Sequence, residues 1–155
     1  SWLPLEIKCP EPNSMLKELK TISKDKIDVW IHSAAVLDYV IPDPVEGKIA
    51  SLQGALDIQL AEGAKHIQEL KEKCAGSTRI GFKLESGIKQ KDLVHRAHAQ
   101  IQKSGMTATI ANRIEDYGKD GKPRGWLVDR HGAHFVLETE SDMCDAIRSV
   151  IENNR

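Results

Sequence analysis

The sequence lacks both glycine-rich motifs that commonly cradle phosphate groups, G-x-G-x-x-G and G-x-x-x-x-G-K-[ST]. This argues against a dinucleotide-binding oxidoreductase and against a P-loop nucleotide hydrolase. The chain also lacks an excess of one charge, since 22 Lys and Arg stand against 23 Asp and Glu, for a net charge of −1. This balance argues against a surface for nucleic acid or for anionic membranes. No apolar run in the sequence approaches the roughly 18 residues of a membrane-spanning helix.

Cysteine is scarce, and Cys9, Cys74 and Cys144 stand far apart. An odd, widely spaced set predicts reduced thiols and a cytoplasmic protein, and it does not suggest a disulfide framework. No spacing implies a histidine or basic partner that would activate one of these thiols as a nucleophile. His95 and His98 share a helix face, but no third ligand is spaced to join them. The sequence therefore predicts no metal site formed by protein side chains alone.

Short apolar runs alternate with stretches of helical periodicity, which favours an α/β fold in one domain of 155 residues. Residues 27–31 are apolar almost throughout and predict a strand buried on both faces. Further strands are expected at 5–8, 55–60, 79–82 and 107–111, with a hairpin at 125–129 and 134–137. Helices are expected from Asn13 or Ser14 to Ile22, at 64–74, at 92–103, and after a capping box of Thr139 and Asp142.

The most informative stretch follows the expected strand at 27–31. Two small residues, Ala34 and Ala35, would let a ligand approach the backbone at the carboxyl end of that strand, where open α/β sheets bind ligands. Asp38 could accept hydrogen bonds from a sugar hydroxyl or help hold Mg²⁺, and Lys48 could neutralise phosphate charge. The alternative is a tight turn, a helix-capping carboxylate and a solvated lysine. Spacing alone favours that alternative.

Two further residues stand at the ends of expected strands. Phe82 could stack on a base, although core packing is the better interpretation because the chain has few aromatic residues to build a core. Asn112 could hydrogen-bond to a ligand in the crevice or simply occupy a turn, and the sequence does not decide between them.

Four short segments occur in the order and approximate spacing of one known family. They are Ala-Ala-Val-Leu-Asp-Tyr at 34–39, Gly-Lys-Ile at 47–49, Arg-Ile-Gly-Phe at 79–82 and Thr-Ile-Ala-Asn at 109–112. In these segments the chain resembles phosphopantothenoylcysteine synthetase, the phosphopantothenate–cysteine ligase domain of the DNA/pantothenate metabolism flavoprotein. The resemblance covers nearly the whole chain, and the first segment with its downstream lysine is the specific part.

The resemblance implies a Rossmann-like three-layer fold with a mainly parallel sheet, a C-terminal antiparallel hairpin and a flap strand. It implies a cytoplasmic homodimer of coenzyme A biosynthesis, fused to or associated with a flavin-dependent decarboxylase. With Mg²⁺, a nucleoside triphosphate (CTP in most bacteria, ATP in many eukaryotes) would activate the phosphopantothenate carboxylate as an acyl-nucleotide. The cysteine amine would then attack the acyl carbon.

The family's functional positions can be carried onto matching residues. The resemblance implies that the substrate is bound by Ala34, Ala35 and Asn112. It implies that the nucleotide is bound by Asp38, Lys48, Phe82 and Lys103. Lys48 would also act in catalysis from a flap-like segment. The family has two nucleotide-contacting lysines whose aligned positions lie near Gln100 and Ser104 in this chain. Lys103 is adjacent to Ser104 and could take the place of one of them.

The family opens with a Gly- and Ser/Thr-rich phosphate-binding unit that is not found in these 155 residues. We therefore expect a single ligase-type domain, truncated at its amino end. A second hypothesis is a non-catalytic nucleotide- or coenzyme-binding regulatory module with the same fold. A third, a generic Rossmann-like oxidoreductase, is disfavoured by the missing glycine-rich fingerprint.

Overall fold

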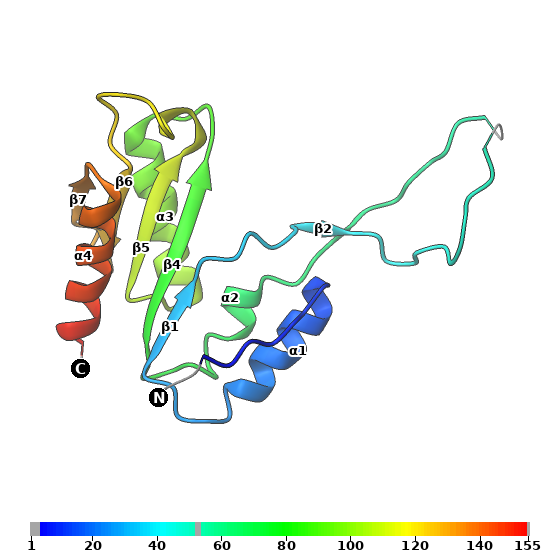
Figure 1. Cartoon of the computed structure of the whole chain (residues 1–155), viewed down its shortest axis with the longest axis horizontal. Coiled ribbons are helices and arrows are strands. Elements are labelled where there is room, and N and C mark those ends of the chain that lie inside the picture. The colour runs from blue at the N-terminus through cyan, green and yellow to red at the C-terminus, as the bar shows by residue number, and fades with distance from the viewer. Residues whose placement is uncertain (1–3, 52–53, 155) are drawn as a thin grey trace.

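The computed structural model describes residues 4–51 and 54–154 of the chain (Figure 1). Four α-helices, one short 3₁₀ helix and seven strands are found in this part. In chain order they are α1 (Pro12–Ile22), β1 (Val29–His32), β2 (Tyr39–Val40), β3 (Ala61–Glu62), α2 (His66–Glu69), β4 (Thr78–Glu85), α3 (Gln90–Ser104), β5 (Ala108–Arg113), η1 (Ile114–Asp116), β6 (Gly125–Asp129), β7 (His134–Leu137) and α4 (Glu140–Glu152). No helix in the described ranges is both long and apolar enough to cross a membrane.

Five strands form one mixed sheet in the order β1-β4-β5-β6-β7. The first three are parallel, with Ile31 opposite Ile80 and Phe82 opposite Ile110. β6 and β7 continue the sheet in antiparallel fashion, as the expected hairpin requires. Because β1, β4 and β5 are parallel, their carboxyl ends meet at one edge of the sheet, which is where open α/β sheets bind ligands.

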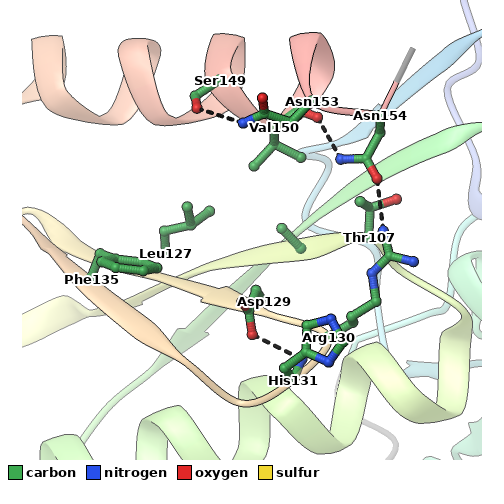
Figure 2. A pocket seen from close by; sticks show the side chains of 11 residues that line it. Thr107, Leu127, Asp129, Arg130, His131, Phe135, Ser149, Val150, Asn153 and Asn154 are labelled. Atoms are coloured by element: carbon green, nitrogen blue, oxygen red, sulfur yellow. Dashed lines mark hydrogen bonds between the residues drawn. The ribbon is translucent and has the colours of Figure 1, made fainter.

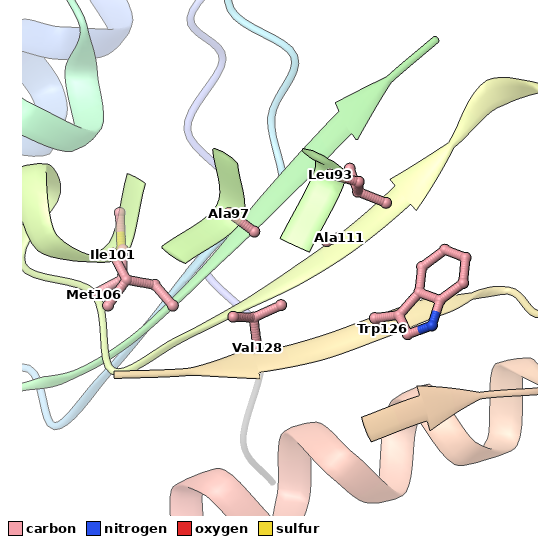
Figure 3. Packing of buried hydrophobic residues seen from close by; sticks show 7 residues of the cluster. All are labelled: Leu93, Ala97, Ile101, Met106, Ala111, Trp126 and Val128. Atoms are coloured by element: carbon pink, nitrogen blue, oxygen red, sulfur yellow. The ribbon is translucent and has the colours of Figure 1, made fainter. Parts of the chain in front are cut away.

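Helices cover both faces of the sheet, which gives the expected three layers. On one face α3 packs its buried side chains, Leu93, Ala97 and Ile101, against Val128 and Trp126 of β6 (Figure 3). On the opposite face α4 contributes half-buried apolar residues to a cluster around Ile80, Ile110 and Leu137. The fold is therefore the α/β architecture that the sequence and the resemblance predicted.

β1 forms the edge of the sheet and is buried on one face only. Trp30 is buried with Leu70 and Cys74, and half-buried residues of α1 pack against this cluster. Ile31 points to the other face and is 49% exposed. The prediction of burial on both faces was wrong, because no helix within residues 4–51 and 54–154 covers this edge strand on the side of Ile31.

Between β1 and α2 the chain leaves the sheet as a long excursion (Figure 1). We call residues 39–62 the arm. At its base β2 pairs with β3 in antiparallel fashion, Tyr39 opposite Glu62 and Val40 opposite Ala61. The resemblance predicted a flap strand in this part of the chain, and the structure forms only this two-stranded antiparallel pair. Apolar side chains along the arm are exposed, namely Tyr39, Ile41, Val45, Ile49, Leu56, Ile58 and Leu60.

Two expected strands do not form. Residues 5–8 and 55–60 have the alternating pattern, but neither segment has a neighbouring strand to complete a hydrogen-bonded ladder. Leu5 is exposed, and so are Leu56 and Ile58. An alternating pattern reports which face a strand would bury, and it does not supply the partner strand.

The helix ends differ from expectation at two places. α1 begins at Pro12, with Glu11 as the N-cap, because proline is already set for the first helical position. Ser14 lies inside α1 and donates a hydrogen bond to the carbonyl oxygen of Glu11 at 2.8 Å. The helix expected at 64–74 is reduced to the four residues of α2, followed by turns.

At the last helix, the capping box is confirmed. The backbone N–H of Asp142 donates to the hydroxyl of Thr139 at 3.1 Å, and Thr139 N–H donates back to the Asp142 carboxylate at 2.9 Å.

The close approach of β5 and β6 requires glycine at position 125. A Cβ atom placed on Gly125 would lie 2.6 Å from the carbonyl oxygen of Ala111, which is main chain in the middle of the sheet and cannot move aside.

We expect Gly125→Ala to lower the free energy of unfolding by about 1–3 kcal/mol through overpacking. Urea unfolding followed by circular dichroism measures this. Gly118→Ala is a matched control for the loss of a glycine, since nothing lies within 4 Å of its Cβ position, although its positive φ adds some strain. Equal stability of Gly125→Ala and the unmodified protein would contradict the prediction.

Candidate functional site

Two adjoining cavities lie beside the carboxyl ends of β1 and β4 and together form what we call the crevice. The larger cavity has about 350 Å³, and the smaller one about 130 Å³. Asp38, Lys65, Ile67 and Gln100 line both. The crevice is thus bounded by the chain that follows β1, by α2 with its flanking residues, and by α3.

An ion pair stands where the two cavities join. The Lys65 ammonium donates a hydrogen bond to the carboxylate of Asp38. This hydrogen bond and the charge of Lys65 hold the pKa of Asp38 below its ordinary value. The carboxylate is therefore charged at neutral pH and anchors the segment after β1 to the start of α2.

The larger cavity is strongly cationic. Four cationic side chains line it, against Asp38 as the one acid among its lining residues: Lys65, Lys83, Arg96 and Lys103. Glu85 lies behind this group and pairs with Lys83 at 3.0 Å and with Arg96 at 2.9 Å. Burial raises the pKa of Glu85, but the two cations outweigh it and the net shift is downward. The excess of positive charge suits an anionic ligand such as a polyphosphate.

A buried guanidinium lies beneath the crevice. The Arg79 side chain is 1% exposed and donates to the carbonyl oxygen of Ser104 at 2.6 Å and to that of Ile67 at 2.9 Å. Its Nε and one terminal nitrogen each lie 3.3 Å from Nε2 of His32. Arg79 therefore ties β4 to the end of α3, to α2 and to the end of β1, the elements that surround the crevice.

Two histidines line the smaller cavity, His32 and His66. Burial, and then the charge of Arg79, lower the pKa of His32 to about 4. Burial is also the main cause that lowers the pKa of His66, with a smaller contribution from Lys20. Both imidazoles are neutral at pH 7. His66 is 5% exposed, and neither of its ring nitrogens has a hydrogen-bond partner in the described part of the chain.

The structure brings together four of the residues that the sequence singled out. Ala34, Asp38 and Phe82 line the smaller cavity, and Lys103 lines the larger one beside Asp38. Phe82 is also packed against the apolar cluster under α4, as the core interpretation expected, and its carbonyl oxygen accepts a hydrogen bond from Gln100 at 3.4 Å.

The other three predicted residues lie outside the crevice. Ala35 is exposed beside it and lines neither cavity. Lys48 is exposed on the arm. Asn112 is half-buried on β5, opposite Leu84 of β4, and does not line the crevice either. Their functional roles remain predictions.

Several residues of this region were not identified from the sequence as site residues, namely Lys65, His66, His32, Arg79, Lys83 and Arg96. Lys65 carries the clearest signal, because it is a cation shortly before a helix, at the same end of the sheet as Asp38. Arg79 is the first residue of the Arg-Ile-Gly-Phe segment that carries the resemblance, but nothing in the sequence indicated that its side chain would be buried beside the crevice.

Another cavity, of about 420 Å³, lies at the opposite edge of the sheet (Figure 2). The β6–β7 hairpin and the end of α4 form its walls, and Arg130 donates a hydrogen bond across it to Asn154 at 2.7 Å. None of the predicted site residues lines it.

Acidification should destabilise the fold through His32. Its pKa is about 4 in the folded protein and near 6.5 when unperturbed, so between these values the unfolded chain binds a proton that the folded chain does not. The free energy of unfolding should therefore fall as pH drops from 6.5 to 4, by up to roughly 3 kcal/mol from this group. His66 acts in the same direction. Urea unfolding at several pH values measures this. Between pH 6.5 and 4 the free energy of unfolding should fall less steeply with decreasing pH in His32→Gln than in the unmodified protein. An identical pH dependence in the two proteins would contradict the prediction.

Comparison with known proteins identifies the family. The family model of the DNA/pantothenate metabolism flavoprotein C-terminal domain matches residues 7–153. The chain belongs to this family. The strand-end alanine, the Asp38 carboxylate and the cationic cavity described above therefore lie in a domain of this kind.

Curated relatives agree with this membership. The chain is 30% identical over 121 residues to the coenzyme A biosynthesis bifunctional protein CoaBC of Thermococcus kodakarensis, covering 77% of this chain and 30% of the relative. It is 31% identical over 134 residues to the protein of the same name from Methanocaldococcus jannaschii, covering 86% of this chain and 32% of the relative. The chain thus spans about a third of the length of the curated relatives it matches.

Solved structures show the same fold. The DNA/pantothenate metabolism flavoprotein from Streptococcus pneumoniae superposes with a TM-score of 0.80 at 21% identity, over 94% of this chain and 71% of that one. A Cab2 variant solved in complex with phosphopantothenate-cysteine superposes with a TM-score of 0.66 at 19% identity, over 92% of this chain and 50% of that one.

Proposed function

We propose that this domain is a phosphopantothenate–cysteine ligase of coenzyme A biosynthesis. One observation carries the proposal: a member of this family has a cationic cavity and a small neutral cavity side by side at the carboxyl ends of its parallel strands. The ligation needs these two environments, one for a nucleoside triphosphate and one for an organic substrate. The names of the curated relatives and the ligand of the Cab2 variant support the same assignment.

In the proposed reaction, a carboxylate oxygen of phosphopantothenate attacks the α-phosphorus of CTP or ATP, and pyrophosphate leaves. The cysteine amine then attacks the acyl carbon of the acyl-nucleotide, an amide bond forms, and the nucleoside monophosphate departs with the bonding electrons. Lys65, Lys83 and Lys103 would neutralise negative charge on the phosphates, and Ala34 would let the substrate approach the backbone. Such a reaction needs electrostatic stabilisation and alignment more than a nucleophile on the protein.

Asp38 fits a role in holding Mg²⁺. Magnesium is usually bound through one or two carboxylates together with substrate phosphates, and Asp38 is the carboxylate that lines the cationic cavity. A bound Mg²⁺ would supply charge stabilisation at the phosphates. Lys65, which now pairs with Asp38, would be free to turn toward a phosphate oxygen.

We further propose that the domain forms a cytoplasmic homodimer through the arm. The described part of the arm exposes seven large apolar side chains, and subunit interfaces commonly bury such residues. In a dimer, the second subunit would cover these apolar residues of the arm. It would also hold Lys48, which lies on the arm, in a fixed position relative to the crevice. Since both curated relatives are bifunctional, we propose that the domain works fused to or associated with a flavin-dependent decarboxylase.

The arm proposal predicts a change of oligomeric state. We expect Leu56→Asp combined with Ile58→Asp to convert the dimer into a monomer, because two charges would have to be desolvated in the interface. Analytical ultracentrifugation measures this. Leu5→Asp is the control, since Leu5 is an exposed apolar residue outside the arm. A dimer that survives both arm substitutions would contradict the proposal.

The activity is tested on the protein at the full length that its gene encodes. It is incubated with Mg²⁺, phosphopantothenate, cysteine and either CTP or ATP, and phosphopantothenoylcysteine and pyrophosphate are quantified. Formation of both in equal amounts with one of the nucleotides supports the ligase. Nucleotide binding by calorimetry without any product would instead identify the non-catalytic binding module.

A further inference from the structure

The smaller cavity has an unusual floor. It is lined by two neutral imidazoles, His32 and His66, and the guanidinium of Arg79 lies directly behind one of them. The ion pair of Asp38 and Lys65 stands at its junction with the larger cavity. No other part of the described chain combines a buried cation with unpartnered buried histidine.

Arg79 is a buried charge without a carboxylate partner among the described residues. Its hydrogen bonds go to two carbonyl oxygens and to one imidazole nitrogen, all of them neutral. Buried charges in proteins are normally paired with an opposite charge, because removal from water is costly. The field of this guanidinium therefore favours an anion close to the floor of the crevice.

The same contact fixes the tautomer of His32. A guanidinium has only donors, so the Nε2 atom that faces Arg79 must be the acceptor nitrogen of a neutral ring. The ring proton is then on Nδ1, and this atom makes no hydrogen bond within residues 4–51 and 54–154. Donation from Arg79 also polarises the ring and makes the Nδ1–H group a stronger donor.

His66 adds a second unused polar group to the same cavity. Both of its ring nitrogens are buried, and neither has a partner at full hydrogen-bond geometry among the described residues, although the backbone of Pro12 lies close enough to raise the pKa of this histidine slightly. Buried polar groups in proteins are nearly always hydrogen-bonded. A ligand in the cavity would supply the missing partner. The main chain around it is held by Arg79, whose guanidinium binds the carbonyl oxygen of the neighbouring Ile67.

We propose that Arg79 is a positioning residue that holds His32 as a neutral Nδ1–H donor, and that His32 and His66 together bind a substrate carboxylate in the smaller cavity. This inference rests on the proposed function. A volume of about 130 Å³ accommodates roughly four water molecules, which suits a carboxylate with its adjoining carbons and is too small for a polyphosphate. The phosphates then occupy the adjoining cationic cavity, which places the carboxylate beside them for the activation step.

The first experiment reads the tautomer in the unmodified protein. Long-range ¹H–¹⁵N correlation spectra at pH 7 distinguish Nδ1–H from Nε2–H rings, and the signals missing in His32→Gln assign His32 among the six histidines. We expect the Nδ1–H form in the free protein and a mixture of both forms in Arg79→Met, because methionine offers no N–H donor to Nε2. The Nε2–H form in the unmodified protein would overturn the inference, as would an unchanged tautomer in Arg79→Met. A merely structural role of Arg79 would leave the tautomer unaffected.

The second experiment separates the two possible carboxylate donors, phosphopantothenate and cysteine. We expect His32→Gln and Arg79→Met each to raise the KM for phosphopantothenate about 10- to 100-fold, the loss that accompanies removal of a hydrogen bond to a charged group. The KM values for cysteine and for the nucleotide should change less than about twofold. His134→Gln, an exposed histidine on β7, is the matched control.

The possible failures are distinguishable. Absence of ligation in the unmodified protein would remove the proposed function itself. Ligation with an unchanged KM for phosphopantothenate in His32→Gln would overturn this inference alone. A rise confined to the KM for cysteine would also overturn it, since the carboxylate would then come from the other substrate.

Discussion

Replacing Arg79 with alanine is expected to lower the free energy of unfolding by about 2–4 kcal/mol. The substitution leaves the carbonyl oxygens of Ser104 and Ile67 without their donor in a buried place, and it opens a cavity between β4 and α3. Relief of the desolvated charge offsets part of this loss, but alanine fills none of the space and makes none of the hydrogen bonds. The unfavourable contributions therefore dominate.

Arg96→Ala provides the matched control. Its guanidinium also binds an acceptor, Glu85, at 2.9 Å, but half of the side chain is exposed. Exposed ion pairs contribute about 1 kcal/mol or less, so Arg96→Ala should barely change the midpoint of urea unfolding. Equal midpoints for Arg79→Ala and the unmodified protein would show that the buried guanidinium does not hold the elements of the crevice together.

Replacing Lys48 with alanine is expected to lower kcat about 100- to 1,000-fold without changing stability. The resemblance places this lysine on the nucleotide, where its charge would stabilise the transition state. In the structure it is exposed on the arm, so its removal should cost the fold nothing. Steady-state kinetics with saturating substrates measures kcat, and urea unfolding checks the stability.

Lys24→Ala is the matched control for this substitution, since Lys24 is an exposed lysine in the turn after α1 and is distant in sequence from the arm. It should leave kcat unchanged. If Lys48→Ala keeps full activity, Lys48 is a solvated surface residue, which is the alternative that spacing alone favoured.

Much of the fold could be predicted from periodicity. The sequence predicted the strands around Ile80 and Ile110, the helix α3 and the β6–β7 hairpin. In each of them the local pattern of apolar residues indicates which face is buried. The strand expected at 55–60 has an equally clear pattern and does not form. Its apolar residues are exposed in the described structure. A local pattern contains no information about whether a neighbouring strand is available to pair with it.

The candidate site was predictable only in part, for a related reason. Ala34 and Asp38 stand in the short segment between β1 and β2, so the topology places them near the ligand-binding edge of the sheet. Lys65 lies beside Asp38 only because the arm, which separates the two residues in sequence, returns to the sheet. The course of the arm could not be predicted from the sequence. Arg79 is buried because carbonyl oxygens from α2 and α3 converge on it, and such an arrangement exists only once the tertiary structure has formed.

The central claim is that the crevice activates a carboxylate with a nucleoside triphosphate. Isotope exchange tests it most directly: the full-length protein is incubated with Mg²⁺, CTP or ATP, and labelled pyrophosphate, with and without phosphopantothenate and in the absence of cysteine. Reversible formation of an acyl-nucleotide predicts that label enters the nucleoside triphosphate only when phosphopantothenate is present. Exchange that does not depend on phosphopantothenate, or no exchange by a protein that still forms product, would contradict it.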